Sequence, residues 1–185
     1  TLSLHDALPI SGVELAILDE NGKPLPPREV GEIATRSGSN MTGYWNLPEA
    51  TAKTIDGDGW LRTGDAGYMD EDGYLYIHDR IKDMIISGGE NIASSEVERV
   101  IYEMPVVREV AVIGLPDERW GEKPVAIVVL ADDARLDLSD LIDFCRARLA
   151  AFKVPRQLIL RDSLPRNPSG KVLKRVLRAE LEATA

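Results

Sequence analysis

The sequence is divided by residues 79–92, which read Asp79-Arg-Ile-Lys-Asp-Met-Ile-Ile-Ser-Gly-Gly-Glu-Asn-Ile92. Four of the first five residues are charged, which is typical of an exposed linker, and the apolar residues that follow suit a short strand. The two glycines then permit a simple turn or a close approach of the backbone to a ligand. We therefore expect two structural units joined near residues 79–83, with Lys82 as the hinge.

Short strands and turns are expected before this linker. Val13–Leu18 and Val30–Arg36 are rich in strand-forming residues, and Asp70-Glu-Asp-Gly73 lies between two apolar runs as the turn of a β-hairpin. Pro48–Lys53 is expected to be helical, because proline is favoured at the first helical position. This half of the chain is therefore predicted to be mainly strand.

Helices and strands alternate after the linker. Ser95 and Glu98 have the spacing of a capping box, which predicts a helix that ends near Met104, and Ser139 is expected to cap a second helix. The other expected elements are strands at Val107–Leu115, Lys123–Ala131 and Gln157–Leu160 and a last helix at Val172–Ala183. The two halves together indicate the α+β class.

Charge is unevenly placed along the chain. The 22 basic and 31 acidic residues give a net charge of −9, which argues against a nucleic-acid-binding protein because such a protein needs a positive surface. Residues 153–178 are nevertheless basic, with eight Lys or Arg and one acid. This segment either binds an anionic small molecule or forms a solvated helix face.

The cysteine content and the hydropathy pattern indicate a protein without disulfides and without a transmembrane helix. Cys145 is the single cysteine, so no disulfide can form within the chain, and this fits a reducing cytoplasm. It lies in a helical pattern and is expected to be a core residue. No run of 18 apolar residues occurs, so no transmembrane helix is expected.

Three charged side chains are candidates for binding a nucleotide. Asp65 follows a Thr-Gly pair and could accept hydrogen bonds from a vicinal diol such as ribose, although a solvated turn aspartate would look the same. Arg80 has a planar fork suited to ribose or phosphate oxygens, or it is part of a charged linker. Lys171, in a Pro/Ser/Gly loop, could neutralise a transferring phosphoryl group, or it is a solvated loop lysine.

Eight short motifs, most of which contain glycine, occur along the chain in an order that resembles the adenylate-forming (ANL) superfamily. This superfamily comprises acyl-CoA synthetases, luciferases and peptide-synthetase adenylation domains. The resemblance runs from about Gly12 to the end of the chain. It rests on Met41-Thr-Gly-Tyr-Trp-Asn46, Thr63-Gly-Asp65, Asp79-Arg-Ile-Lys-Asp83, Gly88-Gly-Glu-Asn-Ile92, Glu96-Val-Glu98, Gly114-Leu-Pro-Asp117, Trp120-Gly-Glu122 and Pro168-Ser-Gly-Lys171.

This resemblance implies a role for each charged candidate. Asp65 would bind the ribose hydroxyls of ATP or of the acyl-adenylate, and Arg80 would support the same ribose and phosphate region. Lys82 would be the hinge between a large N-terminal domain and a small mobile C-terminal domain. Lys171 would be the catalytic residue that bridges the substrate carboxylate and the α-phosphate.

The resemblance also implies a path for CoA. Gly88, Gly89, Glu90 and Asn91 would line the tunnel for its pantetheine arm, and Gly121 would approach the same substrate. The partners implied are therefore a small carboxylic acid, ATP and CoA, with no nucleic acid. Mg²⁺ is implied as well, but its ligands are expected upstream and none is expected in this chain.

Several motifs of the superfamily are absent, namely the Ser/Thr/Gly-rich phosphate loop, the Thr-Glu motif that helps to hold magnesium, and the acyl pocket. We therefore expect an inactive C-terminal portion of a longer synthetase. Residues 12–80 would complete its N-terminal domain, which is expected to be a distorted barrel of short strands, and 81–185 would form the C-terminal domain. Residues 1–11 resemble a translated sequencing adapter.

The expected reaction joins a fatty or other hydrophobic acid to CoA, because residues 83–92 are most similar to that branch of the superfamily. Two alternatives stay open at this point. One is a peptide-synthetase adenylation domain, which transfers its acyl group to a carrier protein. The other is a nucleotide-binding or interaction module without catalysis.

Overall fold

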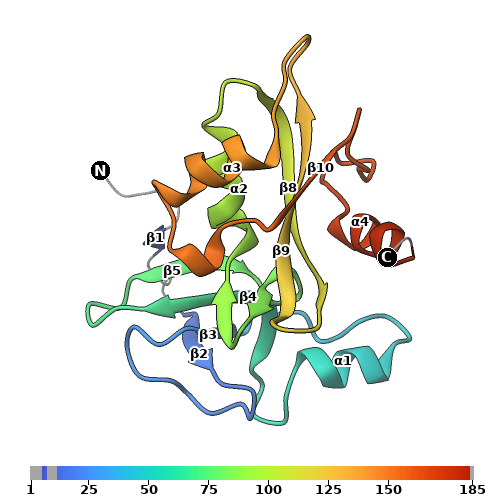
Figure 1. Ribbon diagram of the computed structural model, residues 1–185. Helices are drawn as coiled ribbons and strands as arrows, with labels where there is room; N and C mark the ends of the chain where they lie inside the picture. Colours follow the sequence, from blue (N-terminus) through green and yellow to red (C-terminus); the bar gives the residue numbers. More distant parts are fainter. Residues whose placement is uncertain (1–5, 8–11, 184–185) are drawn as a thin grey trace. The chain divides into compact units, whose positions relative to one another are not determined.

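The computed structural model describes residues 6–7 and 12–183 of the chain (Figure 1). These residues form two compact units, and the boundary between the units lies between Lys82 and Asp83. Both units combine strands with helices, which confirms the predicted α+β class. Most of residues 1–11 lies outside the described residues, and the part that is described, Asp6–Ala7, is a short strand, β1.

The first unit is a five-stranded antiparallel sheet with one short helix. Its strands are β1, β2 (Glu14–Leu18), β3 (Gly31–Arg36), β4 (Leu61–Met69) and β5 (Leu75–Arg80), and its helix is α1 (Pro48–Thr54). The strand order is β1-β5-β4-β3-β2. The expected strands, the helix that begins at Pro48 and the 70–73 hairpin are all present.

Aspartate side chains shape the turns of this sheet. Asp70 Oδ1 accepts the backbone N–H groups of Asp72 and Tyr74 at 3.1 and 2.9 Å, and Gly73 takes a φ of +84°. A side chain that satisfies two backbone donors fixes a tight turn without help from other elements. The hairpin between β4 and β5 is therefore encoded locally.

The second unit is built around a long two-stranded ribbon. The ribbon consists of β8 (Val107–Asp117) and β9 (Gly121–Leu130), and β9 also pairs in parallel with β10 (Gln157–Leu160). The other elements are β6 (Ile85–Ser87), β7 (Glu90–Ile92), α2 (Ser94–Tyr102), α3 (Leu138–Arg146), α4 (Lys174–Glu182) and a short 3₁₀ turn, η2 (Ala151–Lys153). A second 3₁₀ turn, η1 (Ile81–Asp83), contains the chain boundary between the two units.

The ribbon is buried on both faces. Val112, Ala126 and Val128 pack with α2 and α3 in one core, whereas Ala111, Ile113, Val125, Ile127 and Val129 pack with α4 in the other. This alternation explains why β9 is a continuous apolar run, since a strand covered on both faces needs apolar residues at every position. In Figure 1, α2 and α4 accordingly lie on the two sides of β8 and β9.

Two predicted helix caps are wrong. The residue before α2 is Ala93, whose side chain makes no capping hydrogen bond, and the Glu98 carboxylate instead accepts the backbone N–H of Val112 at 2.8 Å. Asp137 rather than Ser139 caps α3, because its Oδ1 accepts the N–H of Asp140 at 2.9 Å. In both cases a tertiary contact or a neighbouring acid replaces the cap that local spacing suggested.

Candidate functional site

The candidate nucleotide-binding pair lies on adjacent strands of the first unit. Asp65 on β4 is in register with Arg80 on β5, and Arg80 Nε lies 3.5 Å from Asp65 Oδ1. The two side chains remain 37% and 46% exposed, respectively. The structure therefore brings together two residues that are 15 positions apart and leaves both within reach of a ligand.

Asp65 lies in a strand rather than in the expected loop, but the strand is irregular there. Glu32 and Ala34 of β3 pair with Ala66 and Arg62, so residues 63–65 stand opposite Ile33 alone. A bulge of this kind turns side chains away from their regular direction. Gly64 supports it with a φ of +76°.

Glu32 fixes the bulge and was not found by sequence reasoning. Its carboxylate accepts Arg62 Nη1 at 2.7 Å and the Gly64 N–H at 3.1 Å, while Thr63 Oγ1 donates to the Ile33 carbonyl at 2.8 Å. Only the strand register places Glu32 beside the Thr-Gly-Asp segment, and the linear sequence separates them by about 30 positions.

Lys171 stands on a tight hairpin before α4. Arg166 pairs with Val172 across this hairpin, and Asn167 Oδ1 accepts the N–H of Lys171 at 2.8 Å. The turn closes at Gly170, which has a φ of +84° and donates its N–H to the Asn167 carbonyl at 2.9 Å. The hairpin thus holds the Lys171 backbone while leaving the residue exposed.

Lys171 differs from several other cations of the basic segment, residues 153–178, because it has no ion-pair partner among the described residues. Four of the eight have carboxylate partners: Lys153, Arg161, Arg166 and Lys174 pair with Glu96, Glu180, Glu109 and Glu98, respectively. Among the described residues, no partner contacts the Lys171 ammonium group. Ion pairs within the protein therefore account for half of these cations, and Lys171 is left available for a ligand.

Two turns lie side by side at the predicted site for the pantetheine arm of CoA. Gly88 and Gly89 form the two-residue turn between β6 and β7, with φ angles of +62° and +86°. Ser87 pairs with Gly121, and the Gly88 N–H donates to the Trp120 carbonyl at 2.8 Å. The expected CoA residues of the first turn and Gly121 are thus neighbours in space.

The Trp120 ring packs against the Gly88–Gly89 turn, and we refer to this turn together with the turn at Gly121 as the turn pair. A Cβ atom on Gly88 would lie only 2.8 Å from the ring, so no larger residue fits without a shift. The guanidinium groups of Arg119 and Arg156 each lie 4.7 Å from the ring centroid, a cation–π distance. Glu90 and Asn91 follow on β7 and are exposed.

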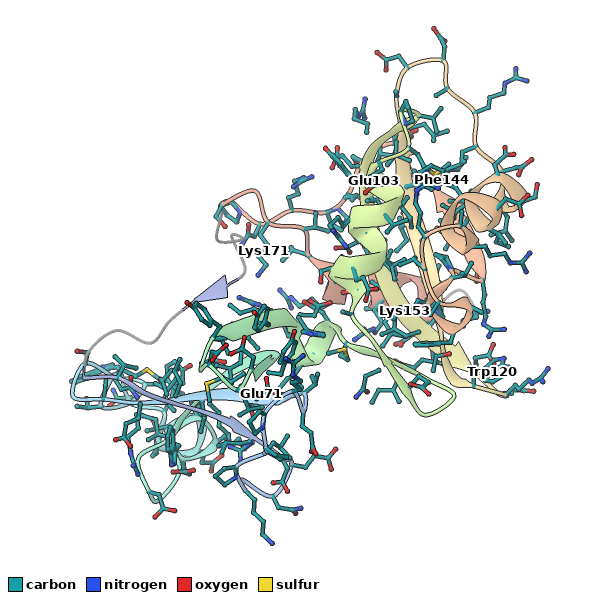
Figure 2. The ribbon with its side chains drawn as sticks, turned by 90° about the vertical axis from the view of Figure 1, so that its left-hand side faces the viewer. Glu71, Glu103, Trp120, Phe144, Lys153 and Lys171 are labelled. Carbon is teal, nitrogen blue, oxygen red and sulfur yellow. The ribbon has the colours of Figure 1, made fainter. Side chains whose placement is uncertain are left out.

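Lys171 and the glycine turns are attached to opposite ends of the β8–β9 ribbon. Arg166 ties the Lys171 hairpin to Glu109 near the start of β8, whereas Gly121 pairs with Asp117 at its end. Eight residues at about 3.3 Å each place these anchor points on the order of 26 Å apart. In Figure 2, the labelled Lys171 and Trp120 accordingly lie far apart.

Three further features concern metal ligands, membrane spans and the cysteine of the part of the chain that the structure describes. No group of three or more His, Cys, Asp and Glu side chains there is arranged to hold a metal ion. None of the described helices is long and apolar enough to cross a membrane. Cys145 is fully buried, and burial raises the pKa of its thiol to about 11, so it is a core residue rather than a nucleophile.

Known proteins match the chain over most of its length. It is 53% identical over 154 residues to the long-chain-fatty-acid–CoA ligase FadD13 of Mycobacterium tuberculosis, which is 83% of this chain and 30% of that ligase. It is 49% identical over 170 residues to the fatty acid–[acyl-carrier-protein] ligase ScoC of Streptomyces coeruleorubidus, 92% of this chain and 33% of that one.

A solved structure gives the same result. ATP-bound MatB from Rhodopseudomonas palustris superimposes with a TM-score of 0.87 at 39% identity, over 96% of this chain and 35% of that chain. The chain therefore corresponds to the C-terminal portion of adenylate-forming enzymes of the ANL superfamily, as the motifs predicted. Within it, residues 96–171 belong to the family of AMP-binding enzyme C-terminal domains. The chain spans about one third of the length of the relatives it matches.

Proposed function

We propose that this chain is the C-terminal portion of an ATP-dependent ligase that joins a carboxylic acid to the thiol of CoA. In the first half-reaction a carboxylate oxygen attacks the α-phosphorus of ATP, which forms the acyl-adenylate and releases pyrophosphate. In the second, the CoA sulfur attacks the acyl carbon and AMP leaves. The observation that carries this proposal is the placement of two candidate sites at opposite ends of one ribbon, because each half-reaction then has its own end.

Adenylation would use Asp65, Arg80 and Lys171. The accessible Asp65 carboxylate would accept hydrogen bonds from the ribose hydroxyls, and the Arg80 guanidinium, 3.5 Å from that carboxylate, would support the same ribose and phosphate region. Attack on the α-phosphate brings two anions together, so a cation without a protein partner lowers the barrier most effectively. Lys171 is such a cation. Mg²⁺ would be held by residues outside this chain.

Thioester formation would use the turn pair at the other end of the ribbon. Gly89 and Gly121 present bare backbone beside open space, which leaves room for the narrow pantetheine arm of CoA, while Gly88 lets the Trp120 ring pack next to them. Glu90 and Asn91 supply exposed polar groups beside it. The domain must rotate between the half-reactions to exchange one end for the other, and Lys82 in η1 is the proposed hinge.

The acid substrate is proposed to be fatty or otherwise hydrophobic. FadD13, which is named for long-chain fatty acids, supports this choice through its 53% identity. The printed name of ScoC specifies an acyl carrier protein as the acceptor, which favours a second candidate function, transfer of the acyl group to a carrier-bound pantetheine. The same glycine turns could receive either acceptor, because both present a pantetheine thiol. The single buried cysteine is consistent with a cytoplasmic ligase.

A chimeric ligase tests the proposed function. The matching C-terminal part of FadD13 is replaced by residues of this chain, and pyrophosphate release is measured with ATP, magnesium and a long-chain fatty acid. We expect sustained release with acid and thioester formation with free CoA. A well-folded chimera that forms no acyl-adenylate would contradict the ligase proposal, and one that acylates only a pantetheinylated carrier protein would establish the second candidate.

A further inference from the structure

We infer that Lys174, together with Glu98 and Ser94, is a positioning clamp for the Lys171 hairpin in adenylation. This inference rests on the proposed role of Lys171. It concerns residues that do not touch substrate themselves but hold the base of the loop that does.

The clamp is a compact and largely buried set of polar groups. Lys174 Nζ donates to Glu98 Oε1 at 2.6 Å and to Ser94 Oγ at 2.7 Å. Ser94 is fully buried, and the side chains of Lys174 and Glu98 are only 16% and 22% exposed. Glu98 Oε1 also accepts the backbone N–H of Val112 on β8. One carboxylate on α2 thus binds both the first lysine of α4 and the backbone of β8.

These contacts join elements that the sheet keeps apart. Ser94 and Glu98 belong to α2, on one face of the ribbon, whereas Lys174 is the first residue of α4, whose Leu177 packs on the other face. The Lys174–Glu98 pair therefore bridges from one face to the other beside β8. It fixes where α4 begins, which is three residues after Lys171.

The other strand of the hairpin has an anchor of its own. Arg166 forms an ion pair with Glu109 of β8, and the Leu173 N–H donates to the Pro165 carbonyl at 2.8 Å. Both ends of the hairpin are therefore tied to the ribbon, and the free part is the short turn that carries Lys171. A catalytic group must be held within about 0.5 Å of its productive position. Because the base of the hairpin is fixed, the range of positions open to Lys171 at its turn is limited.

Helix α2 also offers a matched control. Lys153 Nζ lies 2.6 Å from Glu96 Oε2, and these side chains are 22% and 33% exposed, so this is a similar lysine–glutamate pair on the same helix. It ties α2 to η2 rather than to the Lys171 hairpin. If ion pairs on α2 served only to hold the fold together, loss of either pair would have the same consequences.

Limited proteolysis of the 185-residue chain tests the clamp without reference to catalysis. Trypsin cleavage after Lys171 is timed by mass spectrometry and normalised to cleavage after Arg135, which lies exposed in a loop between β9 and α3. We expect Lys174→Met to accelerate cleavage after Lys171 by about tenfold, because Glu98 loses its cation and the hairpin base opens. Lys174→Arg should restore slow cleavage, and Lys153→Met should leave it unchanged. Unchanged cleavage in Lys174→Met would overturn the clamp.

The chimeric ligase then tests positioning in the reaction. Lys174→Met should lower kcat for acyl-adenylate formation by about tenfold or more, with thioester formation from supplied acyl-adenylate nearly retained and Lys174→Arg recovering most of the loss. Lys153→Met should keep adenylation. Equal losses in both half-reactions would reduce Lys174 to a structural residue. A Lys171→Ala arm separates the two proposals: if adenylation survives Lys171→Ala, the proposed role of Lys171 fails and the clamp fails with it, and if adenylation is lost there but kept in Lys174→Met, only the clamp fails.

Discussion

The turn between β6 and β7 requires glycine for two separate reasons, the backbone conformation and the space available for a side chain. Gly88 and Gly89 both have positive φ angles, but only Gly88 would place a Cβ atom against Trp120, at 2.8 Å, whereas the space around Gly89 is open. We expect Gly89→Ala to lower the free energy of unfolding by about 1 kcal/mol, the cost of a left-handed alanine. Gly88→Ala should cost roughly 2–3 kcal/mol, since overpacking adds to it.

Urea unfolding of the 185-residue chain, followed by circular dichroism, measures both glycine variants under the same conditions. The comparison is matched because the two residues are adjacent and both lie in the left-handed region. Equal losses for Gly88→Ala and Gly89→Ala would show that the Trp120 ring moves aside without cost, so that conformation alone requires the glycines.

The Cys145 thiol provides a pH-dependent prediction. Burial raises its pKa to about 11, against about 8.5 in an unfolded chain. The contribution to stability is therefore complete below pH of about 8.5 and declines as the pH rises towards 11, because only the unfolded state ionises in that window. We expect almost no alkylation by iodoacetamide at pH 8 in the native chain and rapid alkylation in urea. Fast labelling of the folded chain would contradict the burial of Cys145.

The catalytic candidates could be predicted from the sequence, but the residues that hold them could not. Asp65, Arg80 and Lys171 lie in short motifs that are readable along the chain, and the structure leaves all three accessible. Glu32 and Glu98 act across about 30 and 76 positions, on Gly64 and Lys174. Such partners depend on strand register and on which helix covers which face, and neither is encoded in local spacing.

Helices and turns could be predicted from the sequence where side chains of the element itself fix its backbone conformation. The 70–73 hairpin and the Pro48 helix were expected because an aspartate and a proline impose them. The strand β7 was missed, because its three residues pair with β6 through the Gly88–Gly89 turn and carry no strand pattern of their own. The parallel pairing of β10 with β9 spans a helix and likewise has no local signal.

The hinge proposal belongs to the element η1, at whose centre Lys82 lies. If the second unit rotates about Lys82, the φ and ψ angles of that residue must change between half-reactions, and proline fixes φ near −65°. In the chimeric ligase we expect Lys82→Pro to keep adenylation within a fewfold and to lower thioester formation by at least about tenfold. Lys82→Ala, which leaves φ free, should affect both steps mildly.

Pyrophosphate exchange reports the first step for the hinge variants, and CoA consumption from purified acyl-adenylate reports the second. Circular dichroism must first show that the proline variant is folded, since a misfolded protein would lose both steps. A folded Lys82→Pro variant that runs both half-reactions at parental rates would move the hinge away from η1.

At the scale of the whole molecule, one ribbon connects two candidate sites of different chemistry. One end holds Lys171 on a hairpin anchored to Glu109, and the other end holds the glycine turn of Gly88 and Gly89 beside Gly121. The two ends are on the order of 26 Å apart along β8. If each end serves one half-reaction, as proposed, a ribbon of this length must change its orientation between the two steps, which gives the proposed rotation its physical reason.

The most direct test of this division measures both half-reactions in two variants of the chimeric ligase, one at each end of the ribbon. Lys171→Ala should slow acyl-adenylate formation by roughly 100- to 1,000-fold, the usual cost of one preorganised charge-stabilising group, and leave thioester formation from supplied acyl-adenylate nearly unchanged. Gly89→Leu, which fills the open space at the turn, should give the opposite pattern. If both variants slow the same half-reaction, or each slows both equally, the two ends of the ribbon do not have separate functions.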